Sequence, residues 1–367
     1  MYIHELNAWP KFVFSYELLA RPLASVRYQQ GRLTGRVERL PGNLREQAVS
    51  RTISADVLAT CKLDGQTLAP DHVNAIVAGR LAIGAAEPGP GEHAADGVLK
   101  MIFDASEHFA QPLSPERLFG WHAALVAAGG ISSLRAKTHG WRDSSADEIN
   151  AVLSAIGTDR AHFQAPAAHR LDDEVQAFLN WFERGPAIDL VLKAGIAHFW
   201  FLTIQPFADG SGSIARAIAD MALLRSEGNS QRFYSMSAQI ENEHETYFDM
   251  LARTQRGTLD ITPWLDWFLE CLGRAIERAQ TTLASVLRQA QFWQSAATLP
   301  INDRQRLVLN YLLDHCQPRV NSSTWAALAD CSQDTAHRDI VYLVAQGLLK
   351  KDSQGGRSTA YRLLSEI

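Results

Sequence analysis

The chain has no long apolar run and no surplus of positive charge. Its longest apolar run, around residues 194–204, is shorter than the roughly 20 residues that a membrane-spanning helix needs. Lysine and arginine together number 35 against 40 aspartates and glutamates, which gives a net charge of -5 and a pI of about 6.2. These absences argue against a membrane protein and against a broadly basic nucleic-acid binder.

Cysteines are few and scattered. The chain has 4, with none of the paired spacings of a zinc site or a disulfide framework: Cys61, Cys271, Cys316 and Cys331. We therefore expect reduced thiols in a cytoplasmic protein. The first residues show no basic segment followed by an apolar core, so no signal peptide is expected. A chain of 367 residues that is 46% hydrophobic and 20% charged is typical of two or three soluble globular domains.

The most informative stretch is a glycine-rich loop between two apolar patterns. Residues 205–216 read Gln-Pro-Phe-Ala-Asp-Gly-Ser-Gly-Ser-Ile-Ala-Arg. Residues 194–204 are apolar on nearly every face, which predicts a buried helix. Apolar residues repeat at helical spacing from Ile214 to Leu224. The stretch therefore predicts a buried helix, a tight loop and a second helix.

Such a loop is suited to an anion. Backbone N–H groups at the start of a helix lack internal partners, and the helix dipole favours negative charge there. Asp209 could hold a divalent metal that shares phosphate oxygens, and Arg216 lies one turn into the helix, within reach of another phosphate. The alternative is ordinary turn chemistry, because Gly-x-Gly also occurs before helices with no ligand.

The same stretch resembles the Fic signature, His-Pro-Phe-x-Asp-Gly-Asn-Gly-Arg-x-x-Arg. The matching residues are Pro206, Phe207, Asp209, Gly210, Gly212 and Arg216. Most Fic proteins transfer AMP from ATP to a hydroxyl side chain of a target protein. The resemblance implies ATP and Mg²⁺ as cofactors, with the metal at Asp209 and the phosphates at Gly210, Ser211, Gly212, Ser213 and Arg216.

Three positions depart from that signature. Gln205 replaces the family histidine, which is the general base, and an amide has no basic site near neutral pH. Ser211 is shorter than the family asparagine, and Ser213 has no charge where the family has its first arginine. We therefore expect the catalytic position, Gln205, to be non-functional as a base.

Residues 1–95 are predicted to form an N-terminal helical domain, punctuated at Gly31 and Gly35. Its sequence Thr60-Cys-Lys-Leu-Asp64-Gly65 resembles the inhibitory helix of many Fic proteins, with aspartate for glutamate. The resemblance implies that Asp64 faces Arg216. The alternative is a surface Asp64 before a helix-ending glycine, with Arg216 paired to Asp220 one turn on.

The Fic core is predicted over residues 96–285. Residues 141–166 have the poorest helical pattern, and by resemblance they form the flap, a hairpin that holds a segment of the target protein. We expect His162 and His198 to be structural histidines rather than catalytic ones. Trp264, Trp267 and Phe268 are expected to pack in the core rather than to stack on bases.

After a linker at residues 286–300, residues 301–367 show the element order of a winged helix. The residues that would contact DNA are His337 and Arg338 on the recognition helix, with Lys350, Lys351 and Arg357 on the wing. Nearby aspartates almost cancel the basic residues, and winged helices also dock proteins. DNA binding and protein docking therefore both remain open.

The sequence thus predicts a mainly α protein: a Fic-fold core with a small β-hairpin flap, an N-terminal helical domain and a C-terminal winged helix. The first functional hypothesis is a degenerate Fic protein that acts by binding nucleotide or protein. The alternatives are a working AMP transferase and a DNA-binding regulator. The expected partners are a target protein at the flap, a second copy of the chain and DNA, and no membrane.

Overall fold

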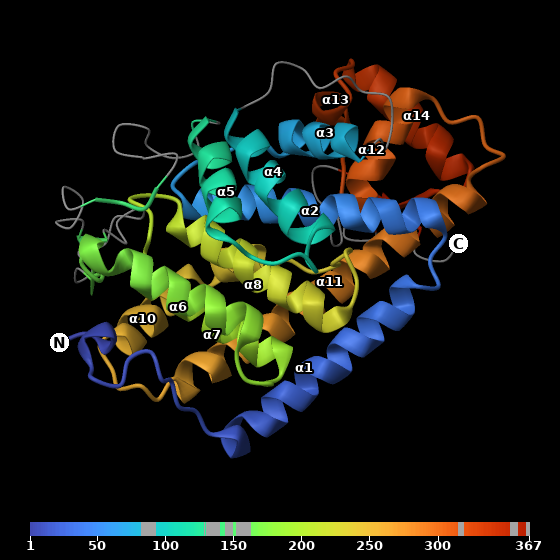
Figure 1. Ribbon diagram of the computed structural model, residues 1–367. Helices are drawn as coiled ribbons and strands as arrows, with labels where there is room; N and C mark the ends of the chain where they lie inside the picture. The colour runs from blue at the N-terminus through green and yellow to red at the C-terminus, as the bar shows by residue number, and fades with distance from the viewer. Residues whose placement is uncertain are drawn as a thin grey trace. The chain divides into compact units, whose positions relative to one another are not determined.

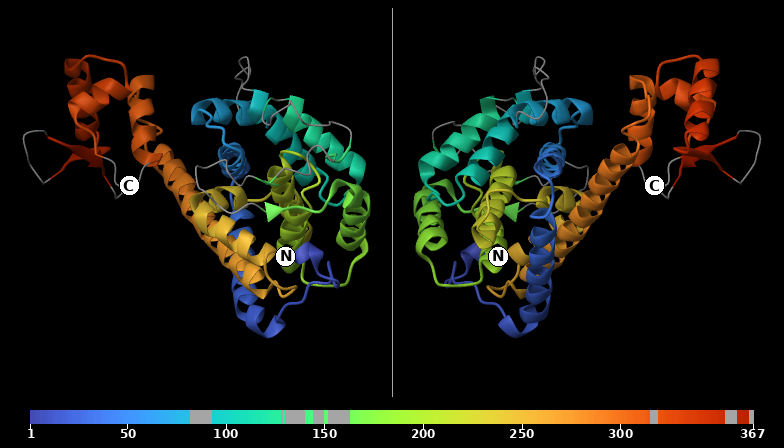
Figure 2. Two further views of the ribbon diagram at one scale, coloured as in Figure 1. Left: turned by 90° about the vertical axis from the view of Figure 1, so that its left-hand side faces the viewer. Right: turned by 90° about the vertical axis from the view of Figure 1, so that its right-hand side faces the viewer.

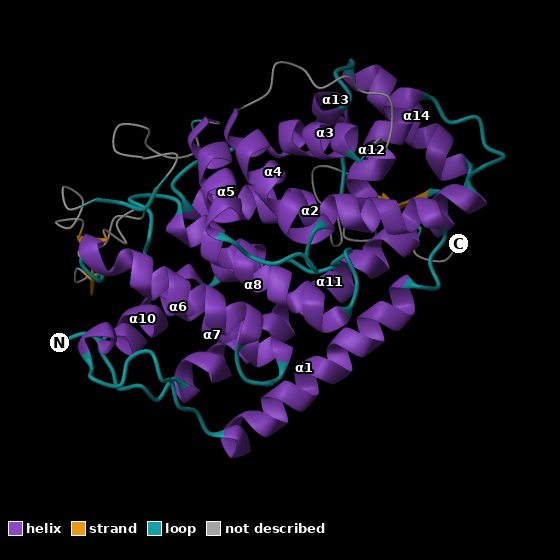
Figure 3. Cartoon of the chain, viewed as in Figure 1, coloured by secondary structure: helices purple, strands orange, loops and turns teal. Residues whose placement is uncertain are grey.

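The computed structural model describes residues 1–81, 93–127, 129, 140–143, 150–151, 163–314, 319–352 and 359–364. The chain divides into two compact units, Met1–Ala279 and Gln280–Ile367 (Figure 1). Helices dominate the described residues, and strands form two short antiparallel hairpins (Figure 3). This confirms the mainly α class. Among the helices of these residues, none has the length and apolar character to cross a bilayer.

The first unit begins with a short 3₁₀ turn and three helices. The bounds are η1 Ile3–Glu5, α1 Tyr16–Val37, α2 Gly42–Leu63 and α3 Pro70–Arg80. Gly31 and Gly35 lie inside α1 and do not interrupt it, because buried apolar residues continue at helical spacing past them, at Leu33 and Val37. The stretch at residues 86–96, rich in proline and glycine, lies mostly outside the described residues, and α4 begins at His93.

The remaining helices of this unit include the buried α7, which packs mainly against α8 and α6. Their bounds are α4 His93–Glu107, α5 Pro115–Ala127, η4 Ala168–Arg170, α6 Leu171–Arg184, α7 Leu190–Ile204, α8 Ser211–Glu227, α9 Met236–Asn242, α10 His244–Gln255 and α11 Thr262–Ser295. Helix α7 is buried on all sides, as its sequence predicted. A Cβ on Gly195 would come within 2.9 Å of Leu265, so this glycine permits the close approach of α7 and α11. Trp264 donates to the Gly195 carbonyl at 2.8 Å.

The buried aromatic and histidine residues have the structural roles that we expected. Trp264 and Phe268 are fully buried and Trp267 is 5% exposed, so all three pack in the core. His198 is hydrogen-bonded to the Tyr247 hydroxyl at 3.0 Å, which satisfies a buried polar group. Burial lowers the pKa of His198 to about 3, so its ring is neutral.

Two short strands lie where the flap was predicted. β1 (Asn150–Ala151) pairs antiparallel with β2 (Phe163–Gln164). Residues 152–162, which include His162, lie outside the described residues. The two strands are thus an antiparallel pair in the region predicted as the flap, and its target-binding role stays a prediction.

In the second unit, the described residues form three further helices and an antiparallel pair of strands. Its elements, besides the end of α11, are α12 Asp303–Asp314, α13 Ser322–Leu328, α14 Gln333–Ala345, β3 Leu349–Lys351 and β4 Tyr361–Leu363. Ser332 caps α14 through its hydroxyl, which accepts from the Thr335 N–H. This order is the one from which the sequence predicts a winged helix.

The expected linker at residues 286–300 is largely helical. Helix α11 continues to Ser295, and the long continuous helix is visible in both views of Figure 2. Phe292 and Ala296 are buried in the core of the second unit. The expectation failed because apolar residues that anchor a helix end to a neighbouring core cannot be told from a linker by composition.

The second unit should depend on the fully buried side chain of Trp325. We expect Trp325→Ala to lower the free energy of unfolding of this unit by about 3–5 kcal/mol, because truncation leaves a cavity. Val341→Ala, at a side chain that is 51% exposed, is the control and should change it by less than about 0.5 kcal/mol. Urea unfolding followed by circular dichroism measures both. Equal unfolding transitions for the two variants would contradict the predicted contribution of Trp325 to stability.

Candidate functional site

The loop between α7 and α8 has two left-handed residues. Gln205 ends α7 with φ 45°, and Gly210 precedes α8 with φ 78°. The left-handed conformation is unfavourable for glutamine by roughly 1–2 kcal/mol, so surrounding contacts must hold it. Arg142 provides them: its Nε donates to the Gln205 carbonyl at 2.8 Å, and its backbone N–H donates to the Pro206 carbonyl at 2.9 Å.

Arg142 also connects this loop to the predicted flap. Its Nη2 donates to the carbonyl of Pro166, two residues after β2. The side chain is buried. Sequence analysis did not identify Arg142, because an arginine beside an irregular segment gives no sign of which carbonyls it will reach.

Ser211 closes the loop upon itself. Its hydroxyl lies 3.2 Å from both the N–H and the carbonyl oxygen of Phe207. The Phe207 ring in turn stacks on His122, with the ring centroids 4.2 Å apart. The Ser211 hydroxyl is therefore engaged with the loop backbone, and only its N–H group is suited to the predicted phosphate contact.

The start of α8 presents free backbone donors. The first helical hydrogen bond runs from the Ile214 N–H to the Gly210 carbonyl at 3.1 Å, so the N–H groups of residues 211–213 precede it. Asp209 is exposed and accepts from the Gly210 N–H at 2.8 Å. No group of three or more metal-ligating side chains occurs among the residues that the structure describes. One carboxylate suits Mg²⁺ when phosphate oxygens and water complete the shell.

Asp64, Ser213 and Arg216 form one connected cluster. The Asp64 Oδ1 lies 3.3 Å from the Arg216 Nη2, and the Ser213 hydroxyl donates to Asp64 Oδ2. Arg216 Nη2 also donates to Ser213 at 2.9 Å and lies 3.4 Å from the Thr60 carbonyl. The predicted contact between Asp64 and Arg216 is therefore present. It is direct, because Asp64 is the C-terminal cap of α2 and Gly65, at φ 81°, ends that helix.

Burial dominates the electrostatics of this cluster. The Arg216 side chain is 5% exposed and that of Asp64 is 18% exposed. Burial raises the pKa of Asp64, while the Arg216 charge and the Ser213 hydroxyl act in the opposite direction. A Cβ on Gly212 would lie 3.4 Å from Arg216 Nη1, so a side chain at position 212 would crowd the guanidinium.

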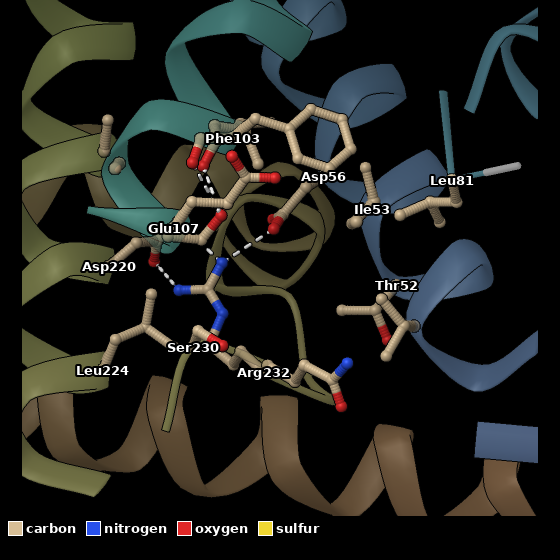
Figure 4. Close-up of a pocket in the computed structure, with 16 residues that line it drawn as sticks. Thr52, Ile53, Asp56, Leu81, Phe103, Glu107, Asp220, Leu224, Ser230 and Arg232 are labelled. Atoms are coloured by element: carbon tan, nitrogen blue, oxygen red, sulfur yellow. Dashed lines mark hydrogen bonds and ion pairs between the residues drawn. The ribbon is translucent and has the colours of Figure 1, made fainter. Parts of the chain in front are cut away.

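Asp220 is not the partner of Arg216. Its Oδ2 accepts from Arg232 Nη2 at 2.7 Å, and the same nitrogen donates to Asp56 on α2 at 2.7 Å (Figure 4). The alternative in which Arg216 pairs with Asp220 is therefore wrong. Arg232 was missed in the sequence because it lies in the irregular segment between α8 and α9.

The candidate DNA-binding residues belong to the second unit. His337 and Arg338 are exposed on α14; on β3, Lys351 is exposed and Lys350 is partly buried. Arg357 lies outside the described residues. DNA binding by this unit stays a prediction.

The ion pair should stabilise the first unit in a non-additive way. We expect a double-mutant cycle of Asp64→Ala and Arg216→Ala to give a coupling energy of about 1–3 kcal/mol, because either single variant leaves a partly buried charge alone. Urea unfolding measures the cycle. A control cycle of Asp64→Ala with Arg304→Ala, in the other unit, should be additive within about 0.5 kcal/mol. Additivity in both cycles would contradict the coupling.

Asp220 should contribute to the pH dependence of stability. Burial raises its pKa to about 6, with the Arg232 charge opposing. The folded chain therefore holds this proton more tightly than the unfolded chain, so stability from this group rises as pH falls through 6 and is lost as pH rises through 6. From pH 7.5 to 5 the wild-type chain should gain unfolding free energy relative to Asp220→Asn; parallel pH curves for the two would contradict this.

Two family models match the chain. Residues 112–223 match the Fic/DOC family, and residues 2–83 match a domain of unknown function, DUF4172. A curated relative, the protein adenylyltransferase Fic of Nematostella vectensis, is 28% identical over 122 residues, which are 32% of this chain and 27% of that protein. The chain thus spans about a quarter of that relative's length.

Solved structures share the fold. A Fic family protein from Desulfovibrio desulfuricans G20 superposes with a TM-score of 0.54 at 18% identity, covering 95% of this chain and 97% of the other. A Fic domain containing signaling protein from Bacteroides thetaiotaomicron VPI-5482 gives 0.50 at 15% identity, with coverages of 71% and 98%. The loop geometry, the family match and the shared fold agree: residues 112–223 form a domain of the Fic/DOC family.

Proposed function

We propose that this Fic protein uses its α7–α8 site for nucleotide-dependent binding or regulation and transfers AMP poorly. The observation that carries the proposal is the cluster of Asp64, Ser213 and Arg216. In it, the Asp64 carboxylate is paired with the Arg216 guanidinium, which is the group that would otherwise bind a phosphate. The proposal also rests on Gln205, which has no basic nitrogen.

The site retains the features that hold a nucleotide phosphate. The N–H groups of residues 211–213 and the guanidinium of Arg216 suit phosphate oxygens, and Asp209 suits Mg²⁺. Bound ATP with Mg²⁺ would supply the activated phosphoanhydride. The chain's own part is then to orient the phosphates and to compete for Arg216 through Asp64.

Two substitutions reduce the chemistry that can follow binding. Without a general base at position 205, transfer to a hydroxyl is expected to slow by about 10²–10⁴-fold. Ser213 is a neutral donor already engaged with Asp64, so it adds no charge to stabilise the leaving phosphates. The missing positive charge at position 213 and the missing base at position 205 together favour nucleotide binding over AMP transfer.

A working AMP transferase is the second candidate. The observation that favours it is the retained Arg216, placed one turn into α8 beside free backbone donors. The name of the Nematostella vectensis relative, an adenylyltransferase, points the same way. In this case another group would have to accept the proton of the attacking hydroxyl.

The two candidates differ in AMP transfer from labelled ATP. We expect the full chain to label itself and lysate proteins at background level. Gln205→His alone should stay low, because Asp64 still occupies Arg216; Gln205→His with Asp64→Ala and Ser213→Arg should label at least about 10²-fold more strongly. Robust labelling by the wild-type chain that is lost in Gln205→Ala would overturn the proposal and favour the transferase.

A further inference from the structure

A second ionic link joins α2 to α8, away from the Asp64 cluster. Arg232 donates to Asp56 on α2 and to Asp220 on α8, both at 2.7 Å from the same nitrogen. Figure 4 shows the Arg232 guanidinium between the two carboxylates. The hydroxyl of Ser235 donates to the other Asp56 oxygen, so both carboxylate oxygens of Asp56 accept a hydrogen bond.

The two links occupy corresponding places on the two helices. Asp56 lies eight residues before Asp64, about two helical turns along α2. Asp220 lies four residues after Arg216, one turn along α8 and on the same side. One link is the direct contact of Asp64 with Arg216, and the other runs through Arg232.

Apolar packing is incomplete beside the second link. A cavity of about 200 Å³ lies against it, lined by Val49 and Ile53 of α2, by Phe103 of α4 and by Leu224 of α8 (Figure 4). Side chains that line a cavity lose part of their van der Waals contact. In this part of the interface the charges of the link therefore add to the apolar packing in determining where α2 lies.

The charges of the link are strongly desolvated. The side chain of Arg232 is 8% exposed and that of Asp56 is 2% exposed. Hydrogen bonds between such buried charged groups are stronger than surface ion pairs, and losing one partner is costly. The link therefore resists sliding or rotation of α2.

We propose that Arg232 is a positioning residue that, through Asp56 and Asp220, fixes the end of α2 so that Asp64 stays on Ser213 and Arg216. Its nucleotide consequence rests on the proposed function, in which Asp64 competes with phosphate. The link itself does not touch that site; it acts through the position of α2.

The two aspartates allow each end of the link to be weakened separately. Asp56→Asn leaves Arg232 paired with Asp220, and Asp220→Asn leaves it paired with Asp56, so each variant keeps one balanced ion pair and weakens one end of the link. The matched control is Asp189→Asn, which weakens the Arg27–Asp189 pair at 2.9 Å between α1 and the start of α7, away from α2. An asparagine there still caps α7.

Hydrogen exchange of the full chain is the primary test. We expect amides of residues 57–66 to exchange at least about tenfold faster in Asp56→Asn and in Asp220→Asn, and at the wild-type rate in Asp189→Asn. If one of the variants Asp56→Asn and Asp220→Asn does not fold, the other is used for the test. Unchanged exchange, or equal acceleration throughout the first unit, would overturn the positioning role.

Calorimetry with ATP and Mg²⁺ separates this inference from the proposed function. Asp56→Asn should bind about tenfold more tightly than the wild-type chain, and it should add nothing in an Asp64→Ala background, because Asp64 is then absent. Faster exchange with no ATP binding by Asp64→Ala would overturn the proposed function and leave the positioning role standing. ATP binding by Asp64→Ala, with unchanged hydrogen exchange in Asp56→Asn and Asp220→Asn, would overturn the positioning role alone.

Discussion

A guanidinium buried near the start of α8 requires a negative partner, and much of the first unit is arranged around that requirement. Arg216 is almost inaccessible to water, so leaving it unpaired would be costly. In a Fic site that partner can be a phosphate. Here the chain supplies its own anion, because α2 ends with its capping residue, Asp64, on the Arg216 side chain.

The shorter aspartate and the neutral serine fit one another. Where the family signature has its first arginine, Ser213 leaves room for a close carboxylate and donates a hydrogen bond to it. An arginine at this position would add a second positive charge beside the guanidinium of Arg216. The substitutions at positions 64 and 213 are therefore best understood together, as a compact polar cluster in a mostly buried place. This cluster links the N-terminal helices to the Fic domain.

The rigid scaffold of the site is α7. It is apolar on every face, and Gly195 allows α11 to lie against it without a clash. A helix held this firmly fixes the point where the loop begins, and Arg142 then holds the left-handed Gln205 in place. The Fic architecture thus survives the loss of the catalytic histidine, because the loop conformation depends on buried packing and backbone contacts and not on the side chain at position 205.

The sequence by itself determined the local elements of this site. The apolar pattern of α7 required burial, the glycines required a tight loop, and the signature from Pro206 to Arg216 predicted the family before any coordinates. The sequence also showed, without any need for tertiary information, that Gln205 stands where the family signature has its histidine. In the second unit, the sequence placed His337 and Arg338 on a helix, and both lie on α14.

Only the tertiary structure decided which charges meet. Local spacing gave Asp220 as a partner for Arg216 and the family resemblance implied Asp64. The sequence could not choose between a residue four positions away and one 152 positions away. The choice depends on Arg232, which lies outside any regular pattern and takes Asp220 for itself. The extent of α11 was likewise decided by the core that receives Phe292. The periodicity of a sequence shows which face of a helix a residue lies on. Which charged side chains form ion pairs depends instead on the packing that brings distant segments together in the protein interior.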